Sequence, residues 1–517
     1  MYFESPRIVK ISTIDGGKSG AISVIESSKS LPFVIKRVYY IYGCKAGNNR
    51  GFHAHKKLRQ CFVVVNGSVT LRLEGQRGMF EYRLSSPAEA VLIPPGYWRE
   101  MSNFSKDTVI MVLASDDYHE SDYIRDYNEF KFWMESLKTV ASVPYLDFER
   151  YHDLIGKELE HAAIQVIRSN SFIGGVHKRS FERQFAEFCG VRNAIGVGNG
   201  LEALGLILEG LDVGLNDEVI VCAAGFVATP LAISRCKAIP VFVDCDSSGN
   251  IDPRCIEGAI TRKTKAILLT HLYGFPASMN QINSIAKRHK LYVVEDSCQA
   301  HGALYDGKRC GSLATAAAFS FYPTKNLGGY GDGGCITTDD DLLAEKIGKL
   351  ANYGSVIKYH HEFLGTNSRL DELQAALLAV KLPYVDEWNA KRRDLAAIYS
   401  RELADIAGLT LPSAPSNTVP VWHVYAVRVK SGLRDALASY LSEMRIGTNI
   451  HYPKALHLQQ CYESRDKCQK FVEAESQAAE VLSLPLDAVH TEAEILFICS
   501  AVRKFFENHA YLCINKD

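Results

Sequence analysis

Hydrophobic and polar positions follow different patterns in the two parts of this chain. Up to about residue 135, β-branched and aromatic runs alternate with turn residues, as in FVIKRVYYIYG (33–43), RQCFVVVNGSVTLRL (59–73) and DTVIMVLAS (107–115). Many short strands at such spacing are typical of an all-β barrel or sandwich. The segment DYIRDYNEFKFWMESL (122–137) is amphipathic and predicts a helix.

Beyond that segment, helices alternate with short apolar strands. The runs KAILLTHLYG (265–274) and LYVVEDS (291–297) are continuously apolar and end in polar residues, as buried parallel strands do. Between them MNQINSIAKRHK (279–290) predicts a crossover helix. This order indicates an α/β domain with a mostly parallel sheet, whose ligands gather outside the carboxyl ends of the strands. We therefore expect two domains, residues 1–138 and 139–517.

Composition narrows the classes of function. The chain has 517 residues, 58 Lys and Arg and 59 Asp and Glu, so no charge excess indicates binding to nucleic acid or to an anionic membrane. No apolar run reaches the roughly 20 residues that a membrane span needs. The 14 cysteines include no CxxC pair, and the first residues lack a leader pattern, which together favour a reducing cytoplasm.

The stretch RGFHAHKKLRQ (50–60) carries two histidines, His53 and His55, that would share one face of a strand. It resembles the first motif of the cupin family, G-x5-H-x-H-x4-E-x6-G. The positions in register are Gly47, His53, His55 and Gly67. Gln60 stands where the family has a metal-binding Glu, and Arg99 stands where the second motif has a His. A neutral amide is a poor ligand and a guanidinium cannot coordinate a cation, so we expect no metal.

Without a metal, two histidines can act as general acid and base, and an arginine can stabilise an enediolate or bind a diphosphate. The longer runs GSVTLRL, LIPPGYWREM and LASDDYHESDYIRDYNEF extend the likeness to the dTDP-4-oxo-6-deoxyglucose 3,4-ketoisomerases, over residues 5 to about 135. This resemblance implies a cupin barrel of the jelly-roll type. It also implies proton transfer by His53 and His55, and a nucleotide-sugar pocket lined by Arg50, Arg99 and either Tyr39 or Tyr40. We favour Tyr39 because it precedes the histidines by an even step.

In the second part, FSFYPTKNLGGYGDGG (319–334) places Lys325 in a glycine-rich stretch after a strand. VVEDSCQAHGA (293–303) places Asp296 at the carboxyl end of an earlier strand. A lysine amine can bond covalently to a cofactor aldehyde, and a buried carboxylate can keep a pyridinium nitrogen protonated. GVGNGLEAL (196–204) is a glycine-rich turn that enters a helix and suits a phosphate, although it lacks the lysine of a nucleotide P-loop.

Nine motifs in order, among them NGLEAL, EDSCQAHGA, FSFYPTKNLG, NSRLDELQAA and HYPKALH, resemble the DegT/StrS-type sugar-nucleotide aminotransferases over residues 142–517. That family has fold type I, uses pyridoxal 5'-phosphate and carries a smaller C-terminal α/β subdomain. The resemblance implies roles for individual residues. They are Lys325 as the cofactor-binding lysine, Asp296 at the pyridinium nitrogen, Gln299 on the ring-hydroxyl side, Gly200, Leu201 and Ser320 at the phosphate, Phe226 against the ring, Asn367 at a phosphate across a dimer interface, and His451 and Tyr452 on the sugar side.

This chain departs from the family pattern at Leu201, Glu202 and Gly225, where the family usually has Thr or Ser, Asp, and often Thr. Backbone N–H contacts survive such changes, whereas a side-chain bond to a phosphate is lost. The related sugar 3-dehydratases replace the lysine by histidine, so the retained Lys325 argues against that activity.

The two resemblances imply consecutive reactions: a 3,4-ketoisomerisation of dTDP-4-oxo-6-deoxyglucose and a C3 transamination that gives a dTDP-3-amino-3,6-dideoxyhexose. We expect L-glutamate as amino donor, and a homodimer or a higher homo-oligomer in a bacterial cytosol. Two alternatives stay open. The first half could be a non-catalytic binding module ahead of a 4-oxo sugar aminotransferase, or it could be a metal-dependent enzyme or sensor.

Overall fold

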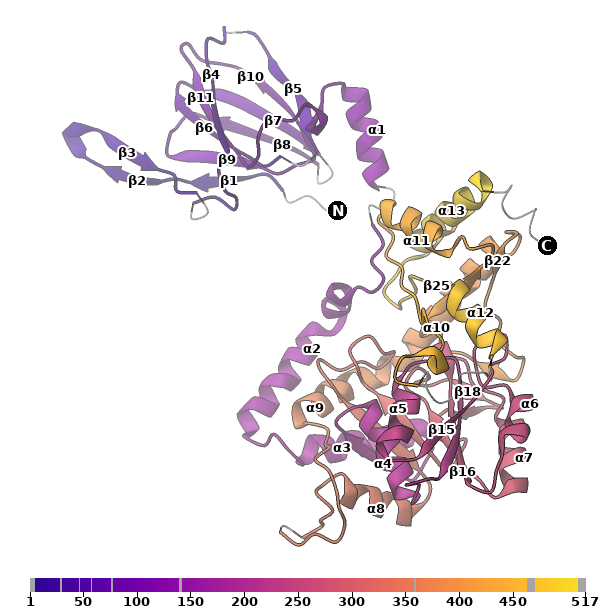
Figure 1. The fold of residues 1–517 in the computed structure, drawn as a ribbon. Coiled ribbons are helices and arrows are strands. Elements are labelled where there is room, and N and C mark those ends of the chain that lie inside the picture. The colour runs from indigo at the N-terminus through magenta and orange to yellow at the C-terminus, as the bar shows by residue number, and fades with distance from the viewer. Residues whose placement is uncertain are drawn as a thin grey trace. The chain divides into compact units, whose positions relative to one another are not determined.

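The computed structural model describes residues 5–27, 30–45, 47–56, 58–75, 78–138, 142–357, 359–462 and 470–509 (Figure 1). The chain forms two compact units, Met1–Ser142 and Val143–Asp517. In the described ranges, no helix is both long and apolar enough to cross a membrane.

The N-terminal unit consists mainly of two five-stranded sheets, in the orders β1-β9-β6-β11-β4 and β12-β5-β10-β7-β8. Every pairing described within them is antiparallel. The strands are β1 (Arg7–Lys10), β4 (Arg37–Ile41), β5 (Arg50–His55), β6 (Gln60–Asn66), β7 (Val69–Gly75), β8 (Gly78–Leu84), β9 (Glu89–Ile93), β10 (Tyr97–Ser102), β11 (Val109–Ala114) and β12 (Tyr123–Ile124), with a separate hairpin of β2 (Ser12–Asp15) and β3 (Ala21–Val24). The expected short strands are confirmed, and the unit is consistent with a cupin-like β domain.

Apolar side chains from both sheets form one core in this unit, with Phe62 and Val64 from the first sheet and Leu71 and Leu73 from the second. These residues alternate along β6 and β7 because successive side chains of a strand point to opposite faces. The inner faces of the two sheets therefore face each other, and polar residues on those faces are enclosed with them.

The helix predicted over 122–137 is wrong at its beginning. Helix α1 covers Tyr127–Lys138 and starts after Asp126, whose carboxylate accepts a hydrogen bond from the Glu129 N–H at 2.8 Å. The preceding residues form a short 3₁₀ turn, Glu120–Asp122, and strand β12, which pairs with β5. Ile124 is fully buried there, so pairing and burial outweigh the helical pattern of the sequence.

The C-terminal unit contains a seven-stranded sheet in the order β13-β21-β20-β17-β16-β14-β15, parallel except for β21. Its strands are β13 (Asn193–Val197), β14 (Glu218–Cys222), β15 (Ile239–Val243), β16 (Thr264–Thr270), β17 (Tyr292–Asp296), β20 (Ala316–Ser320) and β21 (Gly334–Thr338). Helix α7 (Met279–His289) connects β16 to β17, as the sequence predicts. The other helices are α2 (Phe148–Ser169), α3 (Val176–Cys189), α4 (Gly200–Gly210), α5 (Ala228–Arg235), α6 (Pro253–Ile256), α8 (Asp341–Leu350), α9 (Glu372–Lys381) and α12 (Val472–Glu480).

A smaller C-terminal part of this unit is built on the three-stranded sheet β22-β24-β25 (Leu409–Thr410, Tyr425–Val429, Val481–Leu484). Helices α10 (Val385–Leu403), α11 (Arg434–Glu443) and α13 (Glu492–Asn508) accompany it. Tyr399 of α10 stacks on Tyr425 of β24 with ring centroids 4.6 Å apart, which joins helix and sheet. This arrangement is that of aminotransferase fold type I.

Candidate active sites

The first candidate site is a cluster of polar side chains enclosed between the sheets of the N-terminal unit. His53 of β5 lies directly across the strand pair from Arg99 of β10, and His55 follows two residues on. The rings of His53 and His55 are 5.0 Å apart at their centroids. The side chains of His55 and Arg99 are buried. The strand pairing and the ring contact therefore bring the three predicted residues together.

Tyr39 and Tyr40 point in opposite directions from β4. The Tyr39 hydroxyl accepts a hydrogen bond from Gln60 Nε2 at 2.8 Å, whereas Tyr40 is 57% exposed. Tyr39 therefore points into the unit and Tyr40 points to solvent. Arg50 is exposed and donates to the Cys44 sulfur at 3.7 Å, so it does not join the buried group.

Several polar atoms in this cluster are buried without a hydrogen-bond partner among the residues that the structure describes. They are His55 Nε2, Gln60 Oε1, and Nε and Nη1 of Arg99. Leaving such a group unpaired costs about 1–3 kcal/mol, and more for a charged one. Unpaired polar atoms of this kind suit a polar ligand that restores the missing hydrogen bonds.

Burial and the Arg99 charge set the protonation of this cluster. Desolvation, followed by the Arg99 charge, lowers the pKa of His53 to about 4 and moves the pKa of His55 lower still. Burial lowers the pKa of Arg99 itself to about 10, so the guanidinium remains charged at neutral pH. The site therefore combines two neutral imidazoles, which can accept protons, with one fixed positive charge that can stabilise an oxyanion.

Sequence reasoning missed three neighbours of the histidines. Asp122 and Tyr123 were assigned to a helix, yet the Tyr123 ring lies 4.2 Å from the His55 ring and the Asp122 carboxylate lies 2.8 Å from His55 Nδ1. Arg37, whose Nε and Nη2 are buried and unpaired within the described ranges, lies 5.5 Å from the Tyr39 ring. Its even spacing from Tyr39 on β4 was the signal that could have found it.

The second candidate site lies at the carboxyl ends of β17 and β20. Lys325 follows β20 on a loop, and burial lowers the pKa of its amine, while the nearby Cys298 thiol and Asp296 carboxylate oppose part of that drop. Asp296 ends β17, and its Oδ2 accepts a hydrogen bond from Thr229 Oγ1 at 2.9 Å. A second hydroxyl, that of Thr270, lies 3.5 Å away. The pairing of a buried carboxylate with a lysine of lowered pKa fits pyridoxal 5'-phosphate.

A phosphate cradle adjoins this pair. Helix α4 begins at Gly200, and its Asn199 cap accepts a hydrogen bond from the Glu202 N–H at 2.9 Å. A Cβ on Gly200 would lie 2.9 Å from Cys298 Sγ and from Ser320 Cβ, so only glycine lets the helix start so close to the strand ends. The first-turn N–H groups of Gly200 and Leu201 have no acceptor inside the helix and can bind an anion.

Gln299 connects the cofactor region to the predicted sugar side. Its Oε1 accepts a hydrogen bond from the Tyr273 N–H at 2.6 Å, and its Nε2 donates to the Tyr452 hydroxyl at 3.1 Å. The Phe226 ring lies 5.5 Å from the Tyr452 ring and is half exposed. His451 Nδ1 pairs with Ser483 Oγ at 2.8 Å. Burial, with the Lys325 charge second, lowers the pKa of His451 to about 4.

Asn367 lies apart from this group. It is exposed, and its neighbour Ser368 accepts a hydrogen bond from the Gly198 N–H at 3.0 Å. Its predicted role needs a second subunit, so the single chain leaves that role a prediction.

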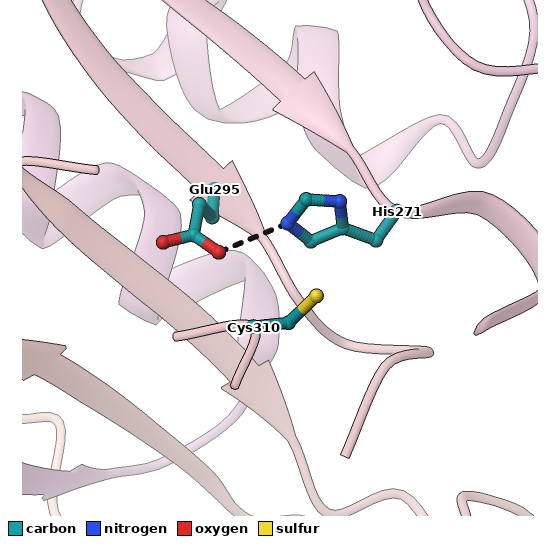
Figure 2. Close-up of side chains that lie close together, drawn as sticks. All are labelled: His271, Glu295 and Cys310. Carbon is teal, nitrogen blue, oxygen red and sulfur yellow. Dashed lines mark hydrogen bonds and ion pairs between the residues drawn. The ribbon is translucent and has the colours of Figure 1, made fainter. Parts of the chain in front are cut away.

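A third cluster, His271, Glu295 and Cys310, has the spacing of a metal site (Figure 2). His271 Nε2 lies 2.9 Å from Glu295 Oε2, and His271 Nδ1 accepts a hydrogen bond from the Ala277 N–H at 3.0 Å. Glu295 also accepts from the backbone N–H groups of Gly311 and Leu313, both at 2.8 Å. Because both imidazole nitrogens are occupied, this cluster is a closed hydrogen-bond network and offers no free nitrogen to a metal.

Known proteins resemble both units. The model of the DegT/DnrJ/EryC1/StrS aminotransferase family matches residues 153–503, and the FdtA model, described as WxcM-like, C-terminal, matches residues 4–135. A dTDP-3-amino-3,6-dideoxy-alpha-D-galactopyranose transaminase of Aneurinibacillus thermoaerophilus is 46% identical over 70% of this chain and 99% of its own. A dTDP-3-amino-3,4,6-trideoxy-alpha-D-glucose transaminase of Streptomyces venezuelae is 43% identical over 72% of this chain and 99% of its own.

Solved structures of aminotransferases also resemble the C-terminal unit. The crystal structure of DesV from S. venezuelae in complex with a ketimine intermediate superposes with a TM-score of 0.70 at 43% identity, over 71% of this chain and 99% of that one. NtdA of Bacillus subtilis with bound PMP gives a TM-score of 0.68 at 30% identity, over 71% of this chain and 86% of that one. This protein is a pyridoxal 5'-phosphate-dependent aminotransferase, and its chain belongs to the DegT/DnrJ/EryC1/StrS family with an FdtA-like domain fused ahead of it.

Proposed function

We propose that the two units catalyse consecutive steps on one sugar nucleotide. The N-terminal unit converts dTDP-4-oxo-6-deoxyglucose to its 3-oxo isomer, and the C-terminal unit transaminates C3 to give a dTDP-3-amino-3,6-dideoxyhexose. The observation that carries the first step is the group of buried, unpaired polar atoms around the two histidines. A merely structural cluster would pair these atoms, because unpaired buried groups destabilise the fold.

The isomerase step needs a base, an oxyanion partner and an acid. A neutral imidazole, His53 or His55, takes the C3 proton, and the charged Arg99 stabilises the enediolate that forms across C3 and C4. The imidazole returns the proton to carbon C4, and the proton of the C3 hydroxyl passes to the C4 oxygen, which leaves the carbonyl at C3. Tyr39 and Gln60 hold each other in place beside this chemistry.

The transamination step uses residues of the second site. Bound pyridoxal 5'-phosphate supplies an aldehyde that carries the amino group and a ring that withdraws electrons. Burial lowers the pKa of the Lys325 amine, which moves protons at Nζ. Asp296 supplies the negative charge for the ring nitrogen, and the first turn of α4 with Ser320 holds the phosphate. His451 and Tyr452 face the sugar, and L-glutamate is the amino donor.

We also propose that the protein is a homodimer or a higher homo-oligomer in which Asn367 reaches a phosphate of the neighbouring subunit. Support comes from the surface beside Asn367. Exposed apolar side chains gather on one loop, at Val356, Ile357, Tyr359, Phe363 and Leu364. Such a concentration on a soluble domain is typical of a surface that another chain covers.

Product analysis tests this function. The purified protein is incubated with pyridoxal 5'-phosphate, L-glutamate and dTDP-4-oxo-6-deoxyglucose, and NMR locates the new amine. We expect it at C3, with the H4 coupling reporting the galacto or gluco configuration. An amine at C4 would contradict the isomerase step and would leave the first unit as a binding module. A Lys325→Ala variant should give no amine while still forming the 3-oxo isomer.

A further inference from the structure

His55 is joined to a carboxylate that sequence patterns did not reveal. Its Nδ1 lies 2.8 Å from Asp122 Oδ2, and both side chains are enclosed, with exposed fractions of 0% and 15%. The Asp122 carbonyl also accepts a hydrogen bond from the Lys56 N–H at 2.9 Å, which fixes the turn against the end of β5. The carboxylate therefore occupies a defined position.

This contact determines which imidazole nitrogen carries the proton. A carboxylate only accepts hydrogen bonds, so His55 must donate from Nδ1, which leaves the lone pair on Nε2. Nε2 is one of the buried atoms without a partner in the described part of the chain. The basic nitrogen thus remains without a partner in the buried cluster, where the charge of Arg99 acts on the ring.

His53 is held differently. Its Nδ1 donates to the backbone carbonyl of Gly51 at 2.6 Å, which gives the same tautomer without a negative charge. When Nε2 takes a proton, the resulting imidazolium at His55 faces a carboxylate, whereas that at His53 faces only a carbonyl. The positive groups around His55 are Arg99, Arg37 and Arg125, and Asp122 is the anion in direct contact with the ring.

We propose that Asp122 is a positioning residue of the isomerase: it fixes the tautomer of His55 and offsets the charge that the imidazole gains when it takes the sugar proton. This inference rests on the proposed isomerase function. Tyr123, which pairs with His55 across β12 and β5, confines the ring from one side. The turn and strand at 120–124 thus complete the site.

Exchange of the substrate C3 hydrogen into D₂O, without an amino donor, tests the proposal. We expect Asp122→Asn to lower the exchange kcat by about 100-fold with little change in KM, because the amide matches the shape of the carboxylate and lacks its charge. Asp122→Glu should recover about tenfold of that loss. Asp117→Asn, an exposed acid on the same loop, is the matched control and should exchange like the wild type.

Two further measurements separate the outcomes. Imidazole ¹⁵N shifts of the intact protein should show the Nδ1–H tautomer at His55, and transamination of a supplied 3-oxo sugar nucleotide should be unchanged in Asp122→Asn. A wild-type protein that neither exchanges the C3 hydrogen nor forms the 3-oxo isomer would contradict the isomerase function itself. Exchange by the wild type with an equally active Asp122→Asn, or an Nε2–H tautomer at His55, would overturn the role of Asp122 alone.

Discussion

Two buried histidine–carboxylate pairs, one in each unit, have nearly the same geometry and different surroundings. His55 lies 2.8 Å from Asp122, and His271 lies 2.9 Å from Glu295. The second ring nitrogen of His271 accepts a backbone N–H, and Glu295 accepts two more. The second nitrogen of His55 is buried and has no partner in the described ranges.

The difference shows that the pair itself does not identify a catalytic site. A pair whose every donor and acceptor is satisfied holds segments of the fold together. A pair with one open nitrogen beside a fixed positive charge keeps a base available for a ligand. The state of the second nitrogen therefore separates a structural role from a catalytic one, and the variants below test that distinction.

The largest effect is expected for His55→Asn. Removal of the base should lower the C3 hydrogen exchange by about 10²- to 10⁴-fold, whereas the melting temperature should change little, because the cluster already tolerates unpaired polar atoms. Exchange measured by NMR beside a thermal melt checks both expectations. Full exchange activity in this variant would assign the proton transfer to another residue.

Glu295→Gln is expected to lower the stability of the fold, whereas His55→Asn lowers the isomerase reaction. The new amide brings an N–H₂ group against the N–H of Gly311 or Leu313, so a donor faces a donor in a fully buried network. We expect the free energy of unfolding of the C-terminal unit to fall by about 2–4 kcal/mol. Urea unfolding monitored by circular dichroism gives this quantity. An unchanged stability would show that the His271 network is not structural.

The periodicity of the sequence predicted the parts of the two sites that lie on single elements. His53 and His55 share a face because they alternate on a strand, and Asp296 and the first turn of α4 lie at strand ends as the α/β pattern predicts. The contact of Asp122 with His55 spans 67 residues, and no local pattern encodes it. Its segment looks helical in sequence and becomes a strand only because β5 offers an edge to pair with.

The pH dependence of the isomerase tests whether the imidazole of His53 is buried and neutral. Since burial and Arg99 lower the pKa of His53 to about 4 from the usual 6.5, the imidazole stays neutral well below pH 6. Activity as kcat/KM should hold as the pH falls from 7 to about 5 and should be lost near 4. A loss of kcat/KM that already begins near pH 6.5 would mean that the histidines are exposed to solvent. Between pH 6.5 and about 4, His53 binds more protons in the unfolded state than in the folded state. The N-terminal unit should therefore lose stability as the pH falls through this range.

The smallest effect on C3 hydrogen exchange is expected for Tyr39→Phe, and the adjacent Tyr40 on β4 offers a matched control. Tyr39→Phe removes the hydroxyl that accepts from Gln60 Nε2, and leaves a second buried polar atom of Gln60 unpaired beside the histidines. We expect C3 hydrogen exchange to fall by about fivefold, the value of one hydrogen bond of roughly 1 kcal/mol. Tyr40→Phe changes the neighbouring residue on the exposed face and should leave exchange as in the wild type. Equal effects of the two substitutions would contradict the inward direction of Tyr39, and with it the assignment of this face of β4 to the cluster.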